Sequence, residues 1–112
     1  MERFEIISIF HTMWGSFPEP VILILKNREI LAVNKAAQTS GAEVGMKCSA
    51  MRPTERHQGC KANDAFETGK AAYHRVRHGE FDVYMFWLPV EGYPEYVIHF
   101  PVGFAVNEKL EY

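Results

Sequence analysis

The chain has 112 residues, 47% of them hydrophobic and 23% charged, and a formal net charge of −2, which fits one folded domain with one modest core. The basic residues do not gather into one run, so nucleic acid is not expected as a partner, because phosphate binding needs a positive patch. No apolar run approaches the ~20 residues needed to cross a bilayer, so no membrane partner is expected either.

The segment from Glu2 to Trp14 is expected to form a helix. Its apolar side chains recur at helical spacing and cover most of its surface: Phe4, Ile6, Ile7, Ile9, Phe10, Met13 and Trp14. Gly15 is expected to take the left-handed conformation that ends many helices. A helix apolar over most of its girth suggests two alternatives, packing on its own domain alone or also meeting a second copy of the protein.

Two β-rich runs follow, residues 21–25 and 30–33, and the polar link between them predicts a hairpin. Residues 34–40 are expected to form a short helix, and residues 42–58 are irregular. A longer helix is predicted from Gly59 to Thr68, with Gly69 as its stop.

The remainder of the chain is expected to form three consecutive strands, residues 72–78, 81–88 and 96–104, before a polar tail. In the first of them the side chains alternate between two faces, with Ala72, His74, Val76 and His78 on one and Tyr73, Arg75 and Arg77 on the other. Two strands, a helical crossing and three strands predict an α+β domain with one five-stranded antiparallel sheet.

This order of elements and several local motifs resemble those of PAS domains. Phe17–Ile22 followed by Ile30–Ala37 resembles the strand pair that opens the family and leads to an Asn at the start of a short helix. Val44–Cys48 resembles the G-x-x-C of one subset, found in bacterial sensor and regulator proteins. Asp64–Lys70 resembles the A-x-x-T-G-K/R/E end of the long PAS helix. The resemblance covers about Pro18 to Phe104.

The resemblance implies a PAS core at residues 17–104, with its helices on one face of the sheet. An N-terminal flanking helix at 1–16 and a tail at 105–112 complete the single domain. PAS domains sense a small molecule, light or redox state, or hold two chains together, and pass the result to an output domain. No kinase, helix-turn-helix or cyclase segment fits beside the core in these residues, so a signalling output protein or domain is expected as partner. Two alternatives stay open: the chain is a piece of a larger sensor, or it signals by association.

The most specific candidate site consists of Cys48, His57 and Cys60. The resembling subset carries a Cys-x-x-Cys before the long helix; Cys60 matches its second Cys, and His57 replaces the first. Imidazole can replace thiolate as a ligand, so the three residues could bind zinc or iron with a fourth ligand or water. An iron–sulfur cluster normally requires four thiolates, and with two cysteines per chain only a site shared between two chains could supply them, so a cluster is discounted.

Two alternatives to this metal site stay open. The cysteines could be small buried hydrophobic residues, a role that free cysteine often has. A disulfide between Cys48 and Cys60 is the other alternative, and it would compete with metal binding because oxidised sulfurs are not thiolate ligands. The chain shows no signal peptide, so a reducing cytoplasm is expected, and there a structural disulfide is rare.

Other cofactors and catalysis are not expected. Flavin-binding PAS photosensors continue after their Cys with residues that this chain lacks at Ser49–Arg52. Heme would need an axial histidine, and His74, His78 and His99 lie on predicted strands, where histidine is more often a surface or core residue. No nucleophile–base–orienter set or catalytic motif is present, so the protein is not expected to be an enzyme.

An apolar ligand pocket is expected between the sheet and the helices of residues 34–68. Its predicted walls are Val33, Met46, Met51, Phe66, His74, Val76, Met85, Trp87 and Ile98. Two functions follow from these expectations. The first is a sensory PAS domain that binds a small ligand or responds to metal or redox state, and signals as a homodimer through the N-terminal helix. The second is a ligand-free PAS-type dimerisation module whose pocket is filled core.

Overall fold

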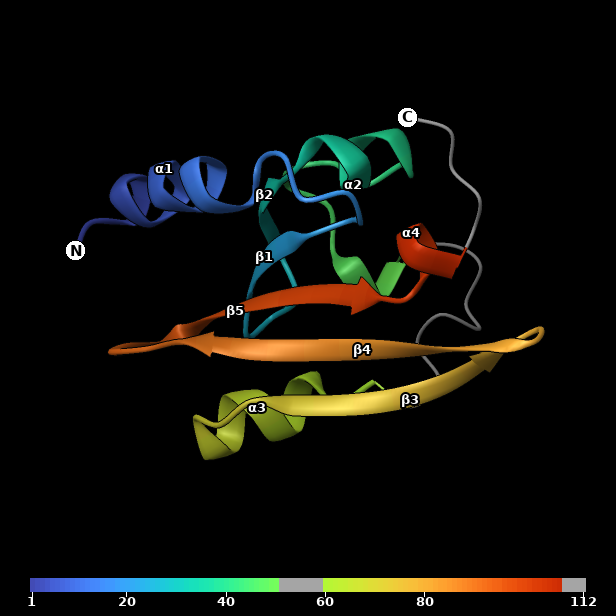
Figure 1. Ribbon diagram of the computed structural model, residues 1–112. Coiled ribbons are helices and arrows are strands. Elements are labelled where there is room, and N and C mark those ends of the chain that lie inside the picture. The colour runs from blue at the N-terminus through green and yellow to red at the C-terminus, as the bar shows by residue number, and fades with distance from the viewer. Residues whose placement is uncertain (51–59, 108–112) are drawn as a thin grey trace.

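The computed structural model describes residues 1–50 and 60–107 (Figure 1). Five strands form one antiparallel sheet in the order β2-β1-β5-β4-β3: β1 (Ile22–Leu25), β2 (Ile30–Val33), β3 (Ala72–His78), β4 (Phe81–Val90) and β5 (Tyr93–Val102). The helical elements are α1 (Arg3–Trp14), α2 (Lys35–Thr39), the 3-10 helix η1 (Cys48–Ala50), α3 (Ala62–Thr68) and α4 (Phe104–Asn107). The predicted α+β class with a five-stranded antiparallel sheet is confirmed.

The sheet separates two hydrophobic clusters. The inner face, covered by α2 and α3, carries the buried residues Ile22, Ile24, Ile30, Ala37, Ala42, Ala62, Ala65, Trp87 and Val97. The outer face, covered by α1, carries Ile6, Phe10, Val21, Leu23, Leu31, Ala32, Tyr96 and Phe100. Side chains alternate between faces along a strand, so β1 contributes to both clusters and is buried on both sides.

The helices cover different parts of the sheet. α1 packs against β2, whereas α3 packs against β3, β4 and β5 (Figure 1). The outer side of β3 and β4 therefore lies away from the helix that covers the rest of the outer face. None of the helices in the described part of the chain is long and apolar enough to cross a membrane.

Most predicted elements are present, with shifted ends. The strand predicted at residues 81–88 extends two residues further, to Val90, and the last strand runs from Tyr93 to Val102. A strand end at residue 104 and a polar tail from residue 105 were predicted. The structure instead has a short helix, α4, which starts at Phe104.

Both helices end at the predicted glycines, but the left-handed conformation is present at only one of them. Gly69 takes the left-handed conformation, with φ of 67°, and ends α3 as predicted. Gly15 does not, because its φ is −54° and its N–H still donates to the His11 carbonyl in helical fashion. The chain instead leaves α1 through the turn that precedes Pro18 and Pro20, which cannot continue a helix.

Candidate functional site

The inner face brings together five of the nine predicted pocket residues. Trp87 is buried there, and the partly buried side chains packed against the same cluster include Val33, Met46, Phe66 and Met85. Two more predicted residues lie on β3 with their backbones opposite inner-face residues of β4. His74 pairs with Met85 and is half-buried, whereas Val76 pairs with Val83 and is exposed.

The two remaining predicted pocket residues do not join this group. Met51 lies outside the described residues. Ile98 packs in the outer cluster, so the prediction that it lines the inner face is wrong. The reason is the two-residue alternation of β5, in which Val97 is fully buried in the inner cluster and its neighbour must point to the other face.

The inner-face residue of β5 next to this position is His99, which the pocket prediction omitted. Its ring stacks on the Trp87 indole, with centroids 4.6 Å apart and planes 8° apart. His99 Nδ1 lies 2.8 Å from the Phe86 carbonyl oxygen, and because that oxygen only accepts, Nδ1 carries the hydrogen. The alternation that buries Val97 is the sequence signal that could have placed His99 here.

The three strand histidines lie in different surroundings. His74 and His99 are half-buried on strands of the inner face. His78 is exposed at the end of β3, where its ring contacts Phe81 at 5.4 Å and Phe104 at 5.1 Å between centroids. His78 therefore belongs to the contacts around α4.

The two cysteines of the predicted metal site are free thiols at the edge of the inner face. Cys48 begins η1, is half-buried and packs against the inner cluster, whereas Cys60 is exposed just before α3. Burial, together with the nearby Cys60 thiol and against the opposing effect of the Arg28 guanidinium, raises the pKa of the Cys48 thiol to about 11. The two thiols and Arg28 therefore share one electrostatic environment.

His57, the third predicted ligand, lies outside the described residues. Within residues 1–50 and 60–107, no group of three or more His, Cys, Asp and Glu side chains is arranged to hold a metal ion. The metal site at Cys48, His57 and Cys60 therefore stays a prediction.

Arg28 is a member of this environment that the sequence interpretation placed only in a hairpin turn. It has a positive φ of 75°, and its carbonyl accepts the Cys48 N–H at 2.9 Å. Its guanidinium bonds the Asn63 side chain and lies 5.3 Å from the Phe66 ring centroid, so it links the β1–β2 hairpin to α3. No sequence signal marks it, because the contact joins segments 35 residues apart.

Two surface hollows lie away from the predicted pocket. One of about 490 Å³ lies beside the β4–β5 hairpin and includes Gly69, Leu88 and Pro94 in its lining. Another of about 340 Å³ lies between the segment after α1 and α2, and includes Phe17, Lys35 and Thr39. Neither is lined by any of the predicted pocket residues.

No protein-family model and no curated protein matches the chain. Solved structures do match. A sensory box sensor histidine kinase from Vibrio cholerae is 10% identical, with a TM-score of 0.61 and 88% of each chain covered. The PAS domain of the histidine kinase ThkA is 22% identical, with a TM-score of 0.57, and the match covers 76% of this chain and 99% of that one.

The PAS domain of BvgS from Bordetella pertussis is 17% identical, with a TM-score of 0.51 and coverage of 85% of this chain and 81% of that one. At these identities the similarity shows the fold, and the chain has the fold of a PAS domain. The expected fold is thereby confirmed, while membership of the subset with the cysteine motif stays a prediction.

Proposed function

We propose that the chain is a sensory signalling domain that acts as a homodimer in the cytoplasm and passes its state to a signalling output protein or domain. The observation that carries this proposal is the apolar surface that α1 and the neighbouring strands leave uncovered on the outer face. PAS domains of sensor histidine kinases are among the structures that share the fold, which fits a signalling role.

α1 buries one side and exposes apolar side chains on others. Ile6 and Phe10 are buried against the sheet, whereas Phe4 is 70% exposed and Met13 71% exposed. Ile9, one turn before Met13, is exposed as well. Single exposed apolar residues are common on proteins, but several on one short helix are typical of a contact surface.

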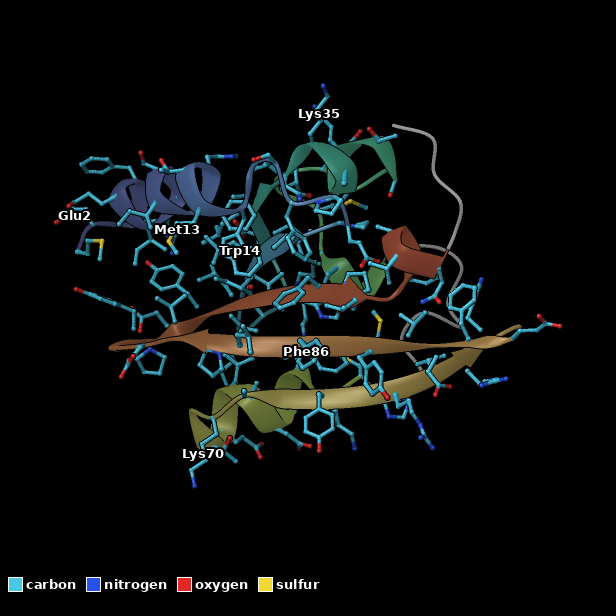
Figure 2. All side chains as sticks on the ribbon, in the orientation of Figure 1. Glu2, Met13, Trp14, Lys35, Lys70 and Phe86 are labelled. Carbon is cyan, nitrogen blue, oxygen red and sulfur yellow. The ribbon has the colours of Figure 1, made fainter. Side chains whose placement is uncertain are left out.

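The apolar surface continues across the sheet as a row of aromatic rings. Trp14 at the end of α1 contacts Phe100 of β5 at 5.0 Å, and Phe100 stacks on Phe86 of β4 at 5.5 Å between centroids. Phe86 in turn contacts Tyr73 of β3 at 6.2 Å, and Tyr73 is 67% exposed. Trp14 and Phe86 can be located in Figure 2. A second copy that lays its α1 over this row would cover both surfaces at once, and exposed tyrosines favour such contacts.

The dimer is tested by measuring molecular mass at several protein concentrations, by light scattering after gel filtration. The wild-type chain is expected to be a dimer, and Met13→Glu a monomer, because it places a charge in the apolar contact. Val44→Glu is the matched control, since Val44 is equally apolar and exposed but lies in the loop after α2. A monomeric wild type, or a dimer that survives Met13→Glu, would refute the proposal.

For the input, we propose that Cys48 and Cys60, with His57, respond to metal or redox state. The two thiols share one environment, and thiolates with imidazole suit zinc or iron. The test is elemental analysis and an absorption spectrum of protein purified without chelator, beside Cys60→Ser. Near-stoichiometric metal that the variant loses would support the site. A metal-free wild type, with the fold intact, would refute the metal site and leave Cys48 as a residue packed against the core and Cys60 as an exposed thiol.

The second candidate is a ligand-free dimerisation module, and one observation favours it. Ala37 of α2 and Ala62 and Ala65 of α3 are fully buried, and these small residues let the two helices pack closely against the inner face. A closely packed inner face leaves less room for a small-molecule ligand. Thermal stability unchanged by a panel of apolar ligands, together with a stable dimer, would favour this candidate.

A further inference from the structure

The segment between α1 and β1 is held by one buried side chain, Asn34. The Asn34 Nδ2 donates to the carbonyls of Trp14 at 3.3 Å, Phe17 at 3.2 Å and Glu19 at 3.0 Å. Its Oδ1 accepts the N–H groups of Val21 and Ala37, both at 2.9 Å. The end of α1, the start of β1 and the start of α2 are therefore fixed to one another.

From this fixed segment, the Glu19 side chain reaches the other end of the domain. Its Oε2 accepts the Gly103 N–H at 2.9 Å, and its Oε1 accepts the Phe104 N–H at 2.8 Å. Glu19 is only 4% exposed. Among the described residues the single ion pair is Arg77–Asp82, so Glu19 is held by backbone N–H groups and not by a cation. Because a buried carboxyl group is costly unless hydrogen-bonded, both donors matter.

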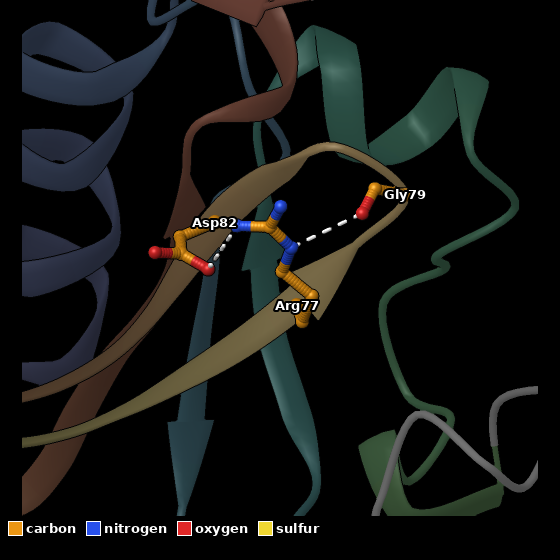
Figure 3. Close-up of polar contacts among 3 residues, drawn as sticks. All are labelled: Arg77, Gly79 and Asp82. Atoms are coloured by element: carbon orange, nitrogen blue, oxygen red, sulfur yellow. Dashed lines mark hydrogen bonds and ion pairs between the residues drawn. The ribbon is translucent and has the colours of Figure 1, made fainter.

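The two N–H groups that Glu19 accepts belong to the junction where β5 ends and α4 begins. This junction is tight, because a Cβ on Gly103 would lie 2.8 Å from the Asp82 carbonyl oxygen. Asp82 is in the β3–β4 hairpin, where Arg77 bonds the Gly79 carbonyl at 3.1 Å and lies 3.5 Å from the Asp82 carboxylate (Figure 3). The start of α4 thus rests between this hairpin and Glu19.

We propose that Glu19 couples α1 to α4. A displacement of α1 moves the segment that Asn34 fixes, and Glu19 carries the displacement to the first N–H groups of α4. Loss of either hydrogen bond would free α4 from the sheet end. The coupling operates within one protomer, so it stands whether or not two copies associate and whether or not the cysteines bind metal.

Hydrogen exchange of the Gly103 and Phe104 amides in the full chain tests the first step. Glu19→Gln keeps the shape of the side chain but replaces one acceptor oxygen by an NH₂ group. Exchange at both amides is expected to rise about tenfold, with the amides of Ile24 and Val97 unchanged. Glu95→Gln, on the exposed part of β5, is the matched control and should change neither pair. An equal rise at all four amides, or no rise at any, would overturn the proposal.

The coupling itself is tested by loosening α1 with Phe10→Ala in both backgrounds. In the wild-type background this change should raise exchange at Gly103 and Phe104, and in the Glu19→Gln background it should add little. Additive effects would mean that Glu19 does not carry the coupling. If Glu19→Gln does not fold, the same pair of measurements is made with Glu19→Asp. The aspartate keeps the charge, but its side chain is too short to accept both the Gly103 and the Phe104 N–H groups.

Discussion

The two faces of the sheet are covered in different ways. On the inner face, the short helices α2 and α3 pack closely through alanines, and the two free thiols, Cys48 and Cys60, lie at the edge. On the outer face, one helix with large side chains covers part of the sheet, and an aromatic row continues beyond it to exposed Tyr73. The comparison teaches that large apolar and aromatic side chains serve both to fill the core and to form a contact surface. The outer face differs from the inner face because α1 covers only part of it.

The largest expected effects come from two adjacent residues of β1 that point to opposite faces. Leu23 is fully buried on the outer face and Ile24 on the inner face. Leu23→Ala and Ile24→Ala should each lower the free energy of unfolding by about 2–5 kcal/mol, because each leaves a cavity in a closed core. Urea unfolding followed by circular dichroism measures both.

A cost below about 1 kcal/mol for Leu23→Ala alone would break the comparison, since such a cost is typical of positions outside a packed core. It would mean that α1 is loosely docked in the isolated chain. Equal large costs would show that α1 is a structural layer of the domain as well as a contact surface.

A smaller effect is expected from a matched pair on β3. Tyr73 lies on the outer face and contacts Phe86, whereas Val76 lies on the inner face and pairs with Val83 of β4. Tyr73 and Val76 are both exposed. Tyr73→Ala should raise the dissociation constant of the dimer roughly tenfold, while Val76→Ala should leave it unchanged. Analytical ultracentrifugation across a concentration series gives both constants. The reverse order of effects would move the dimer contact to the inner side of β3.

The fold was predictable because its signals are local. Alternation fixed the faces of β3, and glycine after a short helical pattern marked the end of α3 at Gly69. The order of elements along the chain, two strands, a helical crossing and three strands, then predicted one five-stranded antiparallel sheet. Ile98 was misplaced because β5 is apolar on both faces, so its composition does not distinguish an inner from an outer position.

The contacts that matter most in the candidate sites could not be predicted in the same way. Glu19 bonds Gly103 across 84 positions of sequence, and Arg28 reaches Asn63 across 35. Nothing in the local pattern distinguishes a buried glutamate at the end of a linker from an exposed one. The proximity of Cys48 and Cys60 was inferred only from a family motif, since the residues between them show no periodic pattern.

A further expected effect, confined to high pH, distinguishes the two roles of Cys48. Burial raises the pKa of its thiol to about 11 in the folded chain, against 9.0 ordinarily. Between these values the unfolded chain has lost a proton that the folded chain still binds, so stability falls as pH rises from about 9 to 11 and is unaffected below. The difference in urea midpoint between the wild type and Cys48→Ser should therefore shift against the wild type as pH rises from about 9 to 11, because the serine has no such titration.

Reactivity gives the matching test of the same thiol. At pH 8 iodoacetamide should modify exposed Cys60 well before Cys48, because the thiolate is the reactive form and burial disfavours it at Cys48. Peptide mass spectrometry after timed quenching follows the two sites separately. Rapid modification of Cys48 at pH 8 would show that its thiol is ionised, as a metal-ligand or redox cysteine requires and a core cysteine does not. The edge of the inner face would then be a reactive surface, and the contrast between a sensing face and an associating face would be sharpened.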